Sequence, residues 1–149
     1  MSLFVESKKM HATAKRLIEI QDSVAFIEIS EVLFLEELET KPKAHAKCFR
    51  LVEHPIGLFT DKKYCIVVYL QNCDWMSDEQ RTLLLWHEML HIPPVGTKLI
   101  DHDVKDFRMI LGVDLDWSEP GCKVPNVLSK NYGKKQRKSD MLDSDESGD

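Results

Sequence analysis

Long hydrophobic runs, paired cysteines and an excess of positive charge are all missing from this sequence of 149 residues. The clearest apolar run, residues 65–70, is far shorter than the about 20 residues that a helix needs to cross a bilayer. We therefore predict no contact with a membrane. The four cysteines form no CxxC pair, and no long apolar stretch follows the basic residues near the N-terminus. Both absences predict a reduced, cytoplasmic protein.

The formal net charge of −5 argues against a nucleic-acid surface that covers the whole protein. Basic residues gather at 130–138 and acidic residues at 140–149, with almost no apolar side chain among them. We predict that residues 129–149 form a disordered charged tail, and we expect no contact with nucleic acid except through its basic part. Residues 1–128, in a chain that is 43% apolar, are predicted to form one domain, which we expect to be a monomer.

The apolar pattern predicts helices and strands together, and hence an α+β domain. Apolar positions recur at helical spacing in residues 10–20, whereas residues 24–35, 46–52 and 64–70 favour strands, the last of them buried. Ser77 and Gln80 form a capping-box pattern, which predicts a helix over residues 78–91 that Pro93 ends. A second helix is predicted from Asp101, as its N-cap, to Gly112.

The residues His87-Glu88-Met89-Leu90-His91 form the pattern HExxH. Residues four apart project from the same face of a helix, so both imidazoles can bind one metal ion. Glu88 lies about 100° further around the helix and can reach a water molecule on that ion. We predict one zinc ion, with Glu88 as the general base when the metal-activated water attacks a peptide bond.

A catalytic zinc ion usually has three protein ligands, so a third donor must come from another part of the chain. We predict His102, because the break at Pro93 and Pro94 and the turn at Gly96 let a second helix present it to the first. Asp106 is expected on the same helical face, where it can orient His87 or His91 through the ring nitrogen that does not bind the metal. Asp103 is a second candidate for such support, and Asp103 and Asp106 both stay open as alternatives to His102.

Residues 86–91, with residues 102–107 and 112–114, resemble the putative phage metallopeptidase family across most of residues 10–117. The resemblance implies a compact zincin-like fold, in which a small mixed sheet packs on the HExxH helix and an edge strand pairs with an extended peptide or protein substrate. By this analogy residues 64–70 would be the strand beside the cleft, and the protein would act in the host cytoplasm. The spacing from His102 to Phe107 is also similar to SprT-type proteases, which act on proteins bound to DNA.

Two other functions stay open at this point. The first is a zinc-stabilised interaction module without catalysis, and the second is a metal-dependent hydrolase that acts on nucleic acid or on a small amide. A cleft lined by lysine and arginine would favour nucleic acid, whereas a groove beside a free strand edge would favour a peptide. His11, His45 and His54 lie far from the motif in the sequence, so they are predicted to be surface or satisfied histidines rather than metal ligands.

Overall fold

The computed structural model describes residues 3–39, 42–51, 60–102 and 106–129. Its elements follow one another as β1 (Phe4–Glu6), α1 (Lys8–Ile20), β2 (Val32–Glu37), β3 (Ala46–Arg50), β4 (Tyr64–Tyr69), α2 (Leu70–Cys73), α3 (Asp78–Met89) and α4 (Arg108–Leu111). None of the described helices has the length and apolar content that a bilayer crossing requires. The predicted tail after residue 129, Asp103 and His54 lie outside the described residues.

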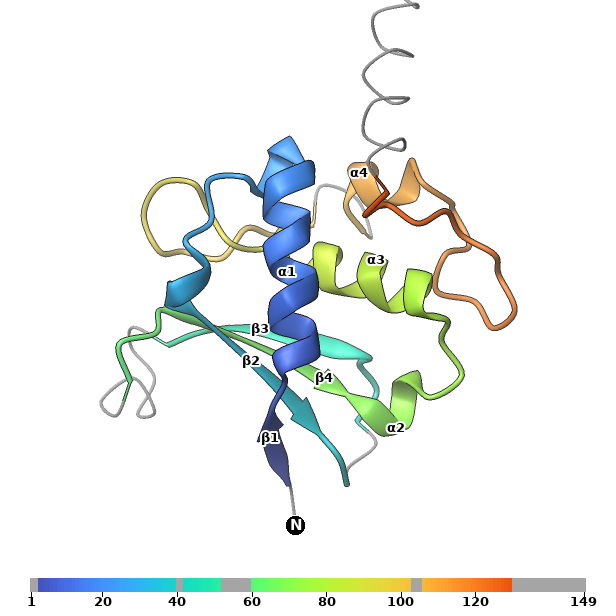
Figure 1. Ribbon diagram of the computed structural model, residues 1–149, viewed down its shortest axis with the longest axis horizontal. Helices are drawn as coiled ribbons and strands as arrows, with labels where there is room; N and C mark the ends of the chain where they lie inside the picture. Colours follow the sequence, from blue (N-terminus) through green and yellow to red (C-terminus); the bar gives the residue numbers. More distant parts are fainter. Residues whose placement is uncertain (1–2, 40–41, 52–59, 103–105, 130–149) are drawn as a thin grey trace, which may run out of the picture.

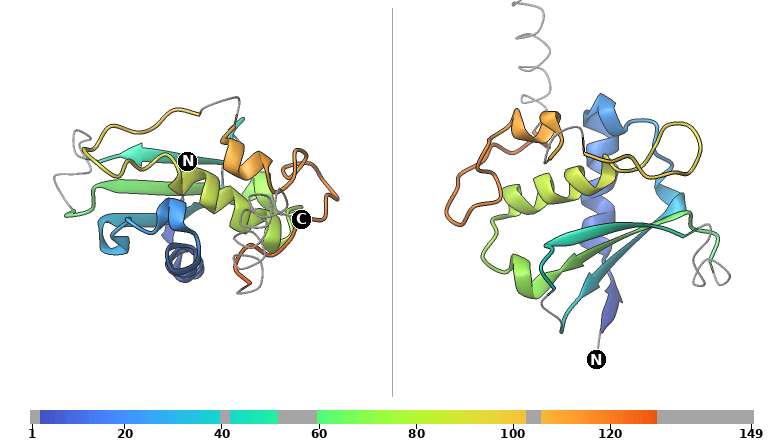
Figure 2. Two further views of the ribbon diagram at one scale, coloured as in Figure 1. Left: turned by 90° about the horizontal axis from the view of Figure 1, so that it is seen from above. Right: turned by 180° about the vertical axis from the view of Figure 1, so that it is seen from behind.

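The four strands form one mixed sheet in the order β1-β2-β4-β3, which confirms the predicted α+β class. β2 and β4 are parallel, and each outer strand is antiparallel to its neighbour. α1 and α3 pack against each other, α1 also contacts β2, and α3 lies over β3 and β4 (Figure 1). The turned view in Figure 2 shows the strands side by side, with β3 at the outer edge.

Every residue of β4 is buried, as expected for a central strand that is covered on both faces. On the helix side Tyr64, Ile66 and Val68 join the main core, in which Trp86 of α3 is fully buried. On the opposite side Cys65 and Val67 pack with other apolar residues in a second cluster. The continuous apolar run in the sequence therefore reflects burial from two sides.

Three predictions about the elements need correction. Residues 24–35 are strand only from Val32 onward, because the chain first makes two short 3-10 turns at Asp22–Val24 and Ile29–Glu31. The helix predicted from Asp101 begins only at Arg108, so His102 lies on an irregular segment. The strand at residues 64–70 is not the edge strand: β4 pairs with β2 on one side and with β3 on the other.

Candidate metal centre

α3 and the turn that follows it supply the first two histidines of the site, and the start of α3 is fixed by local hydrogen bonds. The Ser77 hydroxyl accepts from the Gln80 backbone N–H at 3.1 Å, while the Gln80 side chain accepts from the Ser77 N–H at 3.0 Å. This is the predicted capping box, and it satisfies backbone donors that the first turn leaves free. The helix ends at Met89, and the chain continues in a turn in which His91 N still donates to Glu88 O at 3.2 Å. This hydrogen bond holds His91 in the turn next to the end of α3, on the side where His87 lies.

The segment after α3 brings the third histidine back to the helix. Gly96 has a φ of 77°, a left-handed conformation that glycine adopts without the steric cost of a side chain, and the chain reverses there. Ile100 then contacts His91 twice: its N–H donates to His91 O at 2.7 Å, and its carbonyl oxygen lies 2.6 Å from His91 Nδ1. These contacts hold the segment at α3, and His102 follows two residues later.

The three predicted histidines converge through one atom each. His102 Nε2 lies 2.9 Å from His87 Nε2 and 3.1 Å from His91 Nε2. Two ligands of a tetrahedral zinc ion lie about 3.3 Å apart when each bond is about 2.05 Å long. The separations between these nitrogens are close to that value. The donor set therefore fits a single metal ion.

The other ring nitrogens of His87 and His91 face oxygen acceptors. His87 Nδ1 lies 2.5 Å from Asp106 Oδ1, and His91 Nδ1 faces the Ile100 carbonyl. An acceptor at Nδ1 keeps the proton on that nitrogen, so the lone pair of the neutral ring is on Nε2. Burial lowers the pKa of His91, and the neighbouring His87 and His102 lower it further, against the opposing effects of Ile100 and Asp101. The neutral imidazole is the form that binds a metal.

Asp106 is held by two further hydrogen bonds. Its Oδ1 accepts from the Phe107 N–H at 2.6 Å, and its Oδ2 accepts from Trp117 Nε1 at 2.8 Å. Burial alone raises the pKa of the Asp106 carboxyl, but the hydrogen bonds with His87 and Trp117 outweigh it, and the pKa is lowered. Asp106 thus faces the His87 ring, one of the two predicted for it, from a position that precedes α4.

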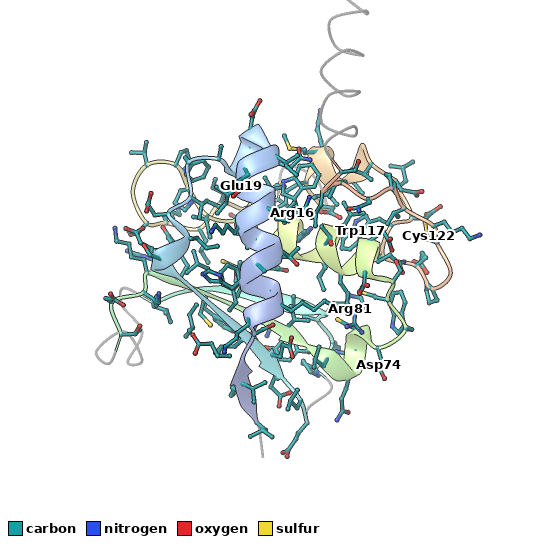
Figure 3. The ribbon with its side chains drawn as sticks, viewed as in Figure 1. Arg16, Glu19, Asp74, Arg81, Trp117 and Cys122 are labelled. Atoms are coloured by element: carbon teal, nitrogen blue, oxygen red, sulfur yellow. The ribbon has the colours of Figure 1, made fainter. Side chains whose placement is uncertain are left out.

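Phe107 was not predicted as part of the site, and Trp117 was predicted only to fill the core or the wall of the cleft. The Phe107 ring lies at 5.3, 5.0 and 5.1 Å from the rings of the three histidines and packs against all of them. Trp117, labelled beside α3 in Figure 3, is held there because Gln80 Nε2 donates to its carbonyl oxygen at 2.9 Å. No short-range pattern identifies Trp117, since it lies 37 residues from Gln80.

Glu88 is only 5% exposed. It borders a cavity of about 320 Å³ that the three histidines also line. Burial raises the pKa of Glu88 to about 7, with Asp106 adding to the increase and His87 opposing it. Three other parts of the chain complete the cavity walls. They are the start of β3 with the residue before it (His45, Ala46 and Lys47), α3 (Leu84), and the segment after α4 (Trp117 and Ser118). His45, which was predicted not to be a metal ligand, lines this cavity, because the start of β3 runs beside α3.

One family model matches this chain, over residues 2–133, and its description is "Putative phage metallopeptidase". No curated protein and no solved structure matches the chain. The match spans every element of the fold and the three converging histidines.

Proposed function

Because the chain belongs to the putative phage metallopeptidase family, we propose that it is a zinc peptidase with a zincin-like site, in which His87, His91 and His102 hold one ion. The observation that carries this proposal is the convergence of the three Nε2 atoms. The Nδ1 atoms of His87 and His91 already face acceptors. Lone pairs that converge in this way repel one another unless a cation lies between them.

Zinc held by these nitrogens would supply Lewis acidity and lower the pKa of a coordinated water to about 7. Glu88 takes the proton of the attacking water and passes it to the nitrogen of the departing amine. A carboxyl group whose pKa is near the working pH suits both transfers, and burial raises the pKa of Glu88 to about 7. Asp106 keeps His87 oriented, and the Ile100 carbonyl does the same for His91.

The position of β3 supports an extended peptide as substrate. β3 is at the edge of the described sheet, and two of its residues line the cavity beside Glu88. An edge strand offers backbone N–H and C=O groups to which a peptide can add as a further strand. Lys47 is the one lysine or arginine among the described residues that line this cavity, and a nucleic-acid site would need more.

The proposal is tested with purified wild type, Glu88→Gln and His102→Ala. We expect one zinc per chain in the wild type and in Glu88→Gln, and a loss of zinc in His102→Ala, measured by elemental analysis. In a broad peptide library the wild type should cleave, whereas Glu88→Gln should be at least about a hundredfold slower. A control change at the exposed Glu19 to Gln should alter neither result.

Two results would contradict the proposal. Full zinc binding by His102→Ala would exclude this ligand set, and Asp103 would become the next candidate to test. Cleavage by Glu88→Gln at the wild-type rate would exclude Glu88 as the base. A wild type that binds zinc but cleaves no peptide would favour the interaction module, and activity restricted to proteins bound to DNA would favour the SprT-like alternative.

A further inference from the structure

The cavity beside Glu88 has an apolar wall. Ala46 of β3, Leu84 of α3 and Trp117 after α4 form this wall, at 7%, 4% and 5% exposure, and all three belong to the main core. The Trp117 ring lies 6.1 Å from the His87 ring. Leu84 lies four residues before Glu88 and therefore projects from the same side of α3, about 6 Å away along the helix axis. The apolar wall thus borders the groups that would act on the substrate.

The side chain of Ala46 lies on the face of the sheet that α3 covers. Ala46 pairs with Val68, which belongs to the main core on the helix side, and directly opposed residues share a face. Cys48 lies on the same face: burial raises the pKa of its thiol, and the nearby Glu88 raises it further. Lys47, between them, directs its side chain to the opposite face of the sheet. The contribution of Ala46 to the apolar wall is therefore a single methyl group.

Hydrogen bonds between β3 and β4 show which backbone groups of β3 face the outer edge of the described sheet. Leu51 N donates to Lys63 O and Tyr69 N donates to His45 O, so residues 45 and 51 direct their backbone groups toward β4. Antiparallel strands alternate in this respect, so Ala46 directs its N–H and C=O to the outer edge. A peptide that pairs with this edge has one residue directly opposite Ala46, and the side chain of that residue lies on the same face, toward the cavity and α3.

The apolar wall selects by charge and by size. A charged side chain loses hydration there and finds no partner on Ala46, Leu84 or Trp117, whereas an aliphatic or aromatic side chain gains from leaving water. An extended chain advances about 3.3 Å per residue, so a side chain that reaches this wall comes from within about two positions of the scissile bond. We propose that Ala46 is a specificity-determining residue, whose small side chain leaves room for one large apolar side chain of the substrate. This specificity rests on the peptidase function proposed above.

The test starts from a peptide that the wild type cleaves and varies the two residues on each side of the cleaved bond, one at a time, to alanine, phenylalanine or aspartate. At one of these positions we expect kcat/KM to be at least about tenfold higher with phenylalanine than with alanine or aspartate, because each methylene group in an apolar pocket contributes about tenfold or more. Ala46→Leu should lower kcat/KM for the phenylalanine peptide at least about tenfold and leave the alanine peptide unchanged. Ala46→Val should act in the same direction and more weakly. Ala12→Leu, the same change at an exposed position of α1, is the matched control and should keep the wild-type preference.

Binding gives a readout that does not depend on turnover. In calorimetry, zinc-loaded Glu88→Gln should bind an alanine-based peptide with a single phenylalanine at least about tenfold more tightly than the same peptide without it. Ala46→Leu in this background should remove the difference, and Ala46→Val replaces it if thermal unfolding shows that Ala46→Leu does not fold.

The two proposals fail in different ways. Equal kcat/KM values for all peptides, or the wild-type preference in the Ala46 variants, would overturn the role of Ala46 and leave the peptidase function intact. If the wild type cleaves no peptide, the peptidase function fails, and the binding measurement alone decides whether the cavity accepts a large apolar side chain beside Ala46.

Discussion

Asp106 connects three parts of the site through a single carboxylate. It faces the His87 ring, accepts from the backbone of Phe107 and accepts from the indole of Trp117. The hydrogen bonds to Phe107 and Trp117 leave the carboxylate little freedom to turn, so it fixes which nitrogen of His87 is available to a metal. In the proposed site, Asp106 would therefore support the metal through His87 without binding it.

Changing Asp106 to Asn should weaken zinc binding by about 10- to 100-fold, the usual effect of losing a carboxylate behind a ligand histidine. The amide keeps the size of the side chain but not its charge. Competition with a chromophoric chelator measures the affinity. Asp116→Asn is the control, because Asp116 is exposed in the loop after α4. Equal zinc affinity in Asp106→Asn and Asp116→Asn would refute the role of Asp106.

Glu88 is the proposed general base, and the burial of its carboxylate lowers the stability of the folded protein. Burial raises its pKa from an ordinary value of 4.5 to about 7 in the folded protein. The folded state therefore binds more protons than the unfolded state between these two values, and the free energy of unfolding falls as the pH rises through this window. Above about pH 7 the full cost is present, on the order of 3 kcal/mol.

Glu88→Gln should accordingly stabilise the metal-free protein at pH 8, and the gain should shrink toward zero at pH 4.5 and below. Glutamine has no proton to lose, so the burial of a charge is avoided. Urea unfolding in the presence of EDTA at pH 4.5, 6 and 8 measures the difference. Glu19→Gln, at an exposed position of α1, should show no such trend, and a destabilised Glu88→Gln at pH 8 would contradict the expectation.

At the scale of the elements, the site is made of a helix end and the segment that returns to it. HExxH specifies how two imidazoles share one side of α3, but it says nothing about the path of residues 92–102. That path depends on the left-handed turn at Gly96 and on the contacts between Ile100 and His91. A helix was predicted to present His102 to α3. In the structure, the contacts between Ile100 and His91 hold the segment that carries His102.

Gly96→Ala should therefore lower both the stability and the zinc affinity. A Cβ at position 96 meets no atom within 4 Å, so the cost comes only from the positive φ, about 1 kcal/mol. Gly121→Ala is the matched control, because Gly121 has a φ of 79° and equally open space but lies outside the metal centre. Thermal unfolding should show a similar loss of stability in both variants. Chelator competition should show a loss of zinc affinity in Gly96→Ala but not in Gly121→Ala. Unchanged affinity in that variant would show that the turn does not position His102.

For the whole molecule, the metal centre joins parts that are far apart in the sequence. His87 lies on α3 and His91 in the turn that follows it, the return segment carries His102, and the loop after α4 carries Trp117, whose carbonyl oxygen accepts from Gln80 of α3. A ligand that binds the folded state alone stabilises it by mass action. Zinc is thus expected to link these segments to the core.

Zinc in about thousandfold excess over its dissociation constant should add about 4 kcal/mol to the free energy of unfolding. For a protein of this size, that corresponds to a rise in Tm of about 10 °C. Differential scanning calorimetry with zinc and with EDTA measures the change, and His102→Ala should lose most of it. A rise of equal size in His102→Ala would place the stabilising metal at a different site.

Local patterns in the sequence were sufficient for the extent of α1, the capping box of α3, the buried strand at residues 64–69 and the HExxH pair. Each of these depends on contacts between residues close in the chain or on a simple period of burial. The same reasoning failed for residues 24–31 and for the segment after Asp101. There, tertiary contacts outweigh weak local preferences.

The sequence by itself thus determined which residue types could bind a metal and how two of them share one helix, because helical geometry fixes that spacing. Only the tertiary structure decided that β3, and not β4, lies at the edge beside the cavity, that Trp117 holds Asp106, and that residues at the start of β3 line the same cavity as Glu88. These relations join residues up to 72 positions apart, such as His45 and Trp117. Such pairs are brought together by the order of strands in the sheet and by packing across it, which no local spacing encodes.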